Sequence, residues 1–164
     1  MPKQISVKRF LWGSAAGLAS LILVGEPALA ADPWVGTWVL NVTGSSYSPG
    51  PAPVAETVTT RDIGDGKLDT IVDVTEQDGK ATHFEITYAN DGADYPIAGP
   101  VPGETASSRY VDAQTLESRL KIGGKAVTMT TEVMAADSQS FISTTIATKR
   151  DGTPVKNVQV YERK

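Results

Sequence analysis

The sequence predicts an all-β fold, an antiparallel up-and-down β-barrel of eight to ten strands. Three observations predict the barrel. Almost every segment after residue 33 alternates with a period of two, Asp-Gly and Gly-Gly turns recur between these segments, and no segment sustains a helical period over three turns. Such turns connect antiparallel neighbours, since a parallel crossover needs a dozen or more residues.

The first thirty residues resemble a cleaved export signal. Lys3, Lys8 and Arg9 form a positive start, an apolar stretch runs over 10–24, and Ala28-Leu29-Ala30 provides a small-x-small cleavage site. The apolar stretch is short for a membrane span, although an uncleaved anchor helix is the alternative. We expect residues 1–30 to be a signal peptide cleaved after Ala30. The protein is then periplasmic or secreted, with no membrane anchor after cleavage.

The remainder, residues 31–164, is expected to form a single β-barrel domain. It holds 12 Lys and Arg against 18 Asp and Glu, a net charge of −6, and no cysteine. A negative surface without a basic stripe repels phosphate backbones, so we expect no nucleic-acid partner.

Ten segments alternate as strands do. Thr and Val dominate them, as half-buried pleated surfaces favour. Short Gly- or Asp-containing turns separate most of them, and the longer connections are 43–53, rich in proline, and 98–104. The expected strands lie near 34–41, 54–62, 67–75, 81–89, 93–98, 106–112, 115–122, 125–134, 139–148 and 154–163.

A sheet of this size must protect its two edges. Closing the first strand onto the last removes both edges and makes a barrel. A two-sheet sandwich is the competing solution, but it usually needs a long crossing connection. Because only two irregular segments exist, the barrel is favoured.

Side-chain parity predicts the barrel interior. Leu116 and Leu120 oppose Glu117, Arg119 and Lys121, so the leucines are expected to point inward. The same rule selects an apolar wall with scattered hydroxyls, typical of a pocket for an amphiphilic ligand. The alternative is that these side chains meet and fill the barrel. The predicted wall consists of Phe84, Ile86, Tyr88, Leu116, Leu120 and Met129, with Val127, Thr131 and Val133 continuing it beside Met129.

The sequence gives little support for a catalytic site or a metal site. His83 is the only histidine, and there is no cysteine, so no His- or Cys-based metal cluster can form. No Gly-x-Ser-x-Gly nucleophile motif occurs. Parity places His83 on the solvent face. We therefore expect no catalytic residues, no metal and no cofactor, and a protein that is not an enzyme.

Two tyrosines lie beside prolines in the longer connections. Tyr47 lies within the Pro-rich segment 43–53, and Tyr95 stands in Asp94-Tyr95-Pro96. Binding residues concentrate on such loops, so both rings are candidates for a lid over a barrel mouth. In the alternative, each ring plugs one end of the barrel.

The chain ends carry a resemblance to known barrels. Val35-Gly36-Thr37-Trp38 resembles the first strand of the calycins, which include lipocalins and fatty-acid-binding proteins, and Val160-Tyr161-Glu162-Arg163 resembles the last strand of the latter. The chain is also similar to small exported bacterial barrels of unassigned function. The resemblance implies that Arg163 lies over Trp38 and closes the barrel.

The same resemblance implies polar anchors for a ligand. Fatty-acid-binding barrels hold a ligand carboxylate with Arg-x-Tyr on the last strand, and the matching residues here are Gln159 and Tyr161. They also insert two helices after the first strand, which the Pro-rich segment 43–53 cannot form.

Three functional hypotheses follow. The first is a ligand-binding barrel for a small hydrophobic or amphiphilic molecule, with Gln159 and Tyr161 as anchors. The second is a solid barrel that binds an envelope protein through the loops around Tyr47 and Tyr95. Catalysis with His83 as the base is the third.

Overall fold

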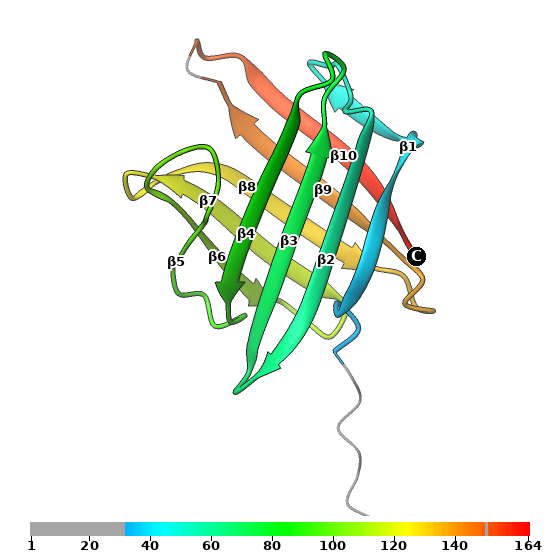
Figure 1. The fold of residues 1–164 in the computed structure, drawn as a ribbon, viewed down its shortest axis with the longest axis vertical. Helices are drawn as coiled ribbons and strands as arrows, with labels where there is room; N and C mark the ends of the chain where they lie inside the picture. Colours follow the sequence, from blue (N-terminus) through cyan, green and yellow to red (C-terminus); the bar gives the residue numbers. More distant parts are fainter. Residues whose placement is uncertain (1–31, 150) are drawn as a thin grey trace, which may run out of the picture. The chain divides into compact units, whose positions relative to one another are not determined.

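The structure is a computed structural model that describes residues 32–149 and 151–164. These residues form one sheet of ten antiparallel strands in the order β4-β3-β2-β1-β10-β9-β8-β7-β6-β5. The sheet curls into a nearly closed barrel in which β1 and β10 lie side by side (Figure 1). The all-β up-and-down fold predicted from the alternation is confirmed. The expected signal peptide lies outside the described residues.

The strand bounds agree with the sequence pattern except in three places. The first strand runs to Ser48, β5 shrinks to two residues, and β6 begins at Glu104. The strands are β1 Gly36–Ser48, β2 Ala55–Gly64, β3 Lys67–Thr75, β4 Ala81–Tyr88, β5 Tyr95–Pro96, β6 Glu104–Tyr110, β7 Thr115–Ile122, β8 Lys125–Met134, β9 Ser140–Thr148 and β10 Pro154–Arg163. Among the described residues, no helix is long and apolar enough to cross a membrane.

Strand β1 is longer than expected because its pairing with β10 resumes after an irregular stretch. Its pairing with β10 shifts between Asn41 and Ser46. The Asn41 side chain accepts hydrogen bonds from Thr43 and from the Gly44 backbone, at 2.9 and 2.8 Å. Ser45 then accepts a hydrogen bond from the Val160 backbone. This segment therefore remains strand where the resemblance to fatty-acid-binding proteins would place helices.

The pairing of β1 with β10 is held by Arg163. Its guanidinium carbon lies 4.1 Å from the centroid of the Trp38 ring. Its side chain also donates hydrogen bonds to the carbonyls of Ser138, Val35 and Pro33 at 2.9, 2.9 and 2.7 Å. A Cβ at Gly36 would collide with the guanidinium, so only glycine leaves room for this contact.

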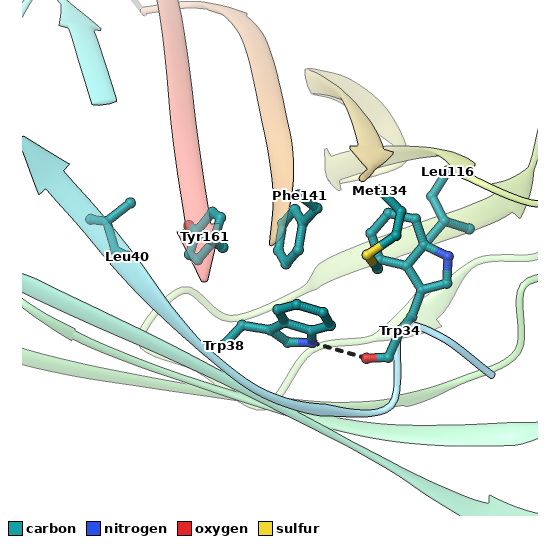
Figure 2. Close-up of a cluster of buried hydrophobic side chains, with 7 residues drawn as sticks. All are labelled: Trp34, Trp38, Leu40, Leu116, Met134, Phe141 and Tyr161. Carbon is teal, nitrogen blue, oxygen red and sulfur yellow. Dashed lines mark hydrogen bonds between the residues drawn. The ribbon is translucent and has the colours of Figure 1, made fainter. Parts of the chain in front are cut away.

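An aromatic cluster fills the barrel at the end where Arg163 lies. Phe141 is its centre, stacked on Tyr161 at 4.7 Å between ring centroids and edge-on to Trp38 at 5.1 Å. The Trp38 indole donates to the Trp34 carbonyl (Figure 2). We call this group the aromatic cluster; its buried members are Trp34, Trp38, Leu40, Leu116, Met134, Phe141 and Tyr161.

The barrel has one seam, between β4 and β5. Hydrogen bonds of 2.8 Å in both directions between the backbones of Glu85 and Ala98 bridge it. Gly99 packs directly on the Phe84 ring, where an added Cβ would lie 2.8 Å from a ring carbon. The segment after β5 thus covers the seam, and the sheet is otherwise continuous.

A β-bulge in the β7–β8 hairpin decides which side chains of β8 face inward. The Gly-Gly turn pairs Ile122 with Lys125, but the register shifts between Leu120 and Lys121, so that Leu120 pairs with Thr128. A one-residue slip exchanges the two faces of a strand. Met129 therefore pairs with Arg119 on the outer surface and is 48% exposed. The prediction that Met129 lines the interior is corrected, and the same slip turns Val127, Thr131 and Val133 away from it.

Removing the Trp38 indole should come close to unfolding the protein. A large-to-small substitution at a site that is 1% exposed costs about 3–5 kcal/mol of unfolding free energy, against a typical total of about 5–15 kcal/mol. Arg163→Ala should cost about 2–3 kcal/mol, because charge-assisted hydrogen bonds and the contact with the indole are lost together. Denaturant titration measures both. The half-exposed neighbour Val39→Ala is the control and should change little; parent-like stability of Trp38→Ala would contradict the closure.

Candidate functional site: a hollow with two buried carboxylates

The barrel is hollow beside the aromatic cluster. A cavity of about 280 Å³ lies between Trp34, Trp38 and Phe141 on one side and polar side chains of seven strands on the other. This volume is near the lower end of the roughly 300–1,000 Å³ typical of ligand pockets. A second hollow of about 150 Å³ lies against β4 and β6, beside the seam. Because Thr70, Tyr88, Ser118 and Glu132 line both, the two hollows adjoin.

Hydroxyl groups make up much of the cavity wall. Thr60 and Thr70 hydrogen-bond each other at 2.9 Å between β2 and β3, and Thr130 and Thr145 do so at 3.0 Å between β8 and β9. Ser143 is buried on β9. The inner faces of β8 and β9 are therefore polar, while apolar side chains such as Ile142 and Ile146 face solvent. This inverts the usual apolar-inside pattern of a sheet.

Glu56 anchors a polar triad at one side of the cavity. The Tyr161 hydroxyl donates to a Glu56 oxygen at 2.7 Å, and the Gln159 amide donates to the other oxygen at 3.2 Å. Gln159 also donates to Tyr161 at 2.8 Å. Burial raises the pKa of Glu56, and these two donors only partly oppose the rise. The expected anchors Gln159 and Tyr161 thus meet inside the barrel, but a carboxylate already occupies their donors.

Glu132 is a second carboxylate on the same cavity wall. The bulge in β8 turns it inward, opposite Leu116 on β7 and Ser143 on β9. Its remaining exposed surface faces the hollow. Burial, with the nearby charge of Glu56, raises the pKa of Glu132 from 4.5 to about 7, although Ser143 partly offsets the rise. The Glu132 carboxyl therefore holds its proton to a much higher pH than an exposed glutamate does.

The tyrosines around the carboxylates stay protonated. Burial raises the pKa of Tyr88 to about 12, and burial with the charge of Glu56 raises the pKa of Tyr161 well above its ordinary value. Tyr47 also has a raised pKa, first through burial and then through Glu56. Tyr88 and Tyr161 therefore line the cavity as neutral phenols, and the Tyr161 hydroxyl already donates to Glu56.

The other predicted wall residues divide into two groups. Tyr88, Leu116, Gln159 and Tyr161 line the main cavity, and Ile86 lines the smaller one. Phe84 lies under Gly99 at the seam, and Leu120 pairs with Ala106 and Thr128. Neither of these two borders the hollows.

The two candidate lid residues lie in strands. Tyr47 belongs to β1, packs against the aromatic cluster, and has a buried hydroxyl without a hydrogen-bond partner among the described residues. Tyr95 belongs to β5 and donates to Asp91 at 2.9 Å. The expected lid is therefore corrected for Tyr47, whose ring is part of the barrel filling.

His83 lies outside the cavity. It is exposed on β4, where its Nδ1 atom lies 2.7 Å from Asp73. Within the described residues, no group of three or more His, Cys, Asp and Glu side chains is placed to hold a metal ion.

Sequence reasoning missed Glu56, Glu132 and Phe141. Glu132 was hidden by the bulge, because the unshifted Gly-Gly hairpin places it outside. For β9, alternation between Phe141, Ser143 and Thr145 on one face and Ile142 and Ile146 on the other is visible in the sequence. It offers no sign that the more polar face is the inner one.

Comparison with known proteins identifies the same architecture elsewhere. Crystal structures of the fluorescent protein UnaG match with a TM-score of 0.54. The wild type is 16% identical over 80% of this chain and 97% of UnaG, and a point mutant is 17% identical over 80% and 96%. No protein-family model and no curated protein sequence matches the chain. The chain therefore shares the fold of UnaG, a nearly closed up-and-down barrel of ten antiparallel strands.

Protein stability should fall as pH rises from 5 to 8. The folded protein holds the Glu132 proton more tightly than an unfolded chain does, so stability is greatest below the unfolded pKa of 4.5 and is lost as pH rises through about 7. The expected loss is about 2 kcal/mol of unfolding free energy. Glu132→Gln should flatten most of this slope, and Glu85→Gln on the outer face should not. Denaturant titrations at both pH values measure it; an unchanged slope in Glu132→Gln would refute the buried acid.

Proposed function

We propose that this chain is an exported, non-enzymatic barrel that binds a small hydrophobic or amphiphilic molecule in its interior. The observation that carries the proposal is the hollow of about 280 Å³ inside a barrel in which the first and last strands, β1 and β10, pair with each other. A filled barrel would leave no such space, since interiors normally pack as densely as organic crystals. Barrels of the fatty-acid-binding type bind small hydrophobic ligands internally, which agrees with this assignment.

The composition of the wall supports an amphiphilic ligand. Trp34, Trp38 and Phe141 offer apolar ring faces at one end. Threonine and serine hydroxyls with Glu56 and Glu132 occupy the rest of the wall. Ligand pockets commonly combine such apolar walls with a few placed polar groups that fix orientation. A ligand with one apolar and one polar end therefore matches both parts.

Filling the cavity should abolish binding without disturbing the surface. Thr130 faces the hollow and Thr131 the outside, so Thr130→Leu and Thr131→Leu introduce the same side chain on opposite faces. We expect native mass spectrometry of the protein purified after export to detect a bound organic molecule in the parent and in Thr131→Leu. In Thr130→Leu, affinity should drop at least about tenfold, because a leucine occupies the space and removes a polar contact.

A polarity-sensitive dye extends this test to protein that has lost its ligand. Parent and Thr131→Leu should take up the dye, and Thr130→Leu should take up little. If the parent carries no organic molecule and takes up no dye, the proposed function is wrong. Equal uptake by both leucine variants would place the binding outside the barrel.

A further inference from the structure

We infer that the interior site selects an amphiphile whose polar end is a positively charged primary ammonium group, and rejects carboxylates. The inference rests on the proposed function and names the ligand class of that same cavity. Its basis is that Glu56 and Glu132 line the same cavity, with no cation among the residues that line it.

The charge inside the barrel has one sign. Glu56 enters from β2 and Glu132 from β8, and both line the main cavity. Neither that cavity nor the hollow beside the seam is lined by Lys, Arg or His. The ion pairs found among the described residues, at His83, Arg109 and Lys121, use other carboxylates. Both cavity carboxylates are therefore without a cationic partner in the described part of the chain.

Such an arrangement is costly for the empty protein. Removing a carboxylate from water costs several kcal/mol unless a counter-charge compensates, and two carboxylates near each other add repulsion. Burial raises the pKa of both groups; the charge of Glu56 adds to the rise at Glu132, and the charge of Glu76 adds to the rise at Glu56. An ammonium group in the cavity would supply the missing counter-charge to side chains that are already desolvated. Its binding would thus be favoured over that of a neutral group of equal size.

The rest of the wall also suits an ammonium. An ammonium group only donates hydrogen bonds, and the hydroxyls of Ser118, Thr130 and Thr145 are acceptors beside Glu132. Aromatic faces attract cations, and Trp34, Trp38 and Phe141 receive the apolar chain. The Trp34 indole N–H, on a side chain 5% exposed, has no partner among the described residues. A hydroxyl or ether oxygen on the ligand would satisfy it.

A carboxylate ligand would find neither a counter-charge nor a free donor on β10 in this cavity. The two donors on β10 that face the cavity, Gln159 and Tyr161, are already hydrogen-bonded to Glu56. A bound carboxylate would bring another negative charge into the same space, without an arginine or lysine to balance it. Unlike charges attract and like charges repel strongly where water is scarce. Fatty acids should therefore be disfavoured despite the shape of the fold.

Three ligands of equal chain length isolate the charge effect. Octylamine, octanol and octanoate are titrated into the delipidated protein at pH 8 and low salt, by calorimetry and tryptophan fluorescence. We expect octylamine to bind at least about tenfold more tightly than octanol, and octanoate at least about tenfold more weakly than octanol. Circular dichroism checks that each variant is folded.

Matched variants assign the preference to the cavity. Glu132→Gln and Glu56→Gln should each bring the octylamine-to-octanol ratio toward one, and Glu85→Gln on the outer face should leave it unchanged. At pH 5 the ratio in the parent should fall about fivefold or more, because Glu132 becomes neutral. The titratable groups that act on Glu132 or are acted on by it are Glu56, Tyr88 and Tyr161, and Glu76 acts on Glu56 in turn. Both tyrosines stay protonated over this range because burial raises the pKa of each.

The outcomes separate the inference from the proposed function. If octanoate binds as tightly as octylamine, or if neither carboxylate variant changes the ratio, the charge selection is wrong while interior binding stands. If none of the three ligands binds the parent, the charge selection is also wrong. The proposed function fails in addition only if the protein carries no organic molecule and takes up no dye.

Discussion

One extra residue in β8 determines the chemistry of the barrel interior. Val127 is unpaired at the bulge, so Leu120 pairs with Thr128. Each later residue of β8 therefore faces the side of the sheet opposite to the one it would face in a hairpin without the bulge. Strand β9 pairs with β8 in the same register, so Glu132 lies opposite Ser143 and Thr130 opposite Thr145. Thr130 and Glu132 face the interior because of this shift, and the register of β9 places Thr145 and Ser143 beside them.

Closure of the barrel fixes where the hollow can lie. Arg163 ties three backbone carbonyls and the Trp38 ring together at the junction of β1 and β10. The aromatic cluster fills the space beneath that junction and includes Tyr161 of the last strand. Apolar packing is thus concentrated at one end of the barrel. The remaining interior can carry polar groups that a filled core would exclude.

The sequence was a good guide to the strands and to the closure of the sheet, for physical reasons. Alternation and Asp-Gly turns are local signals, and they predicted ten segments with bounds close to those of the strands. Trp38 and Arg163 lie on the first and last strands, which pair with each other when the barrel closes.

The interior was harder to predict because its pattern depends on register. Parity selected Ile86, Tyr88 and Leu116 well, since β4 and β7 alternate plainly. Parity failed for Met129, since no local signal marks the bulge. It could not identify Glu56, because the role of Glu56 depends on the hydrogen bonds that it accepts from Tyr161 and Gln159 on another strand. Polar residues on β2, β8 and β10 line the same cavity, and no single stretch of sequence indicates that they do.

Site-directed cysteine labelling tests the inward face of β8 most directly. The chain has no cysteine, so Met129→Cys and Thr130→Cys each introduce a single thiol on adjacent residues. We expect a bulky maleimide to label Met129→Cys at least about a hundredfold faster than Thr130→Cys in the folded protein, and both at equal rates in denaturant. Faster labelling of Thr130→Cys would place the hydroxyls and Glu132 on the outer surface and contradict the acidic hollow.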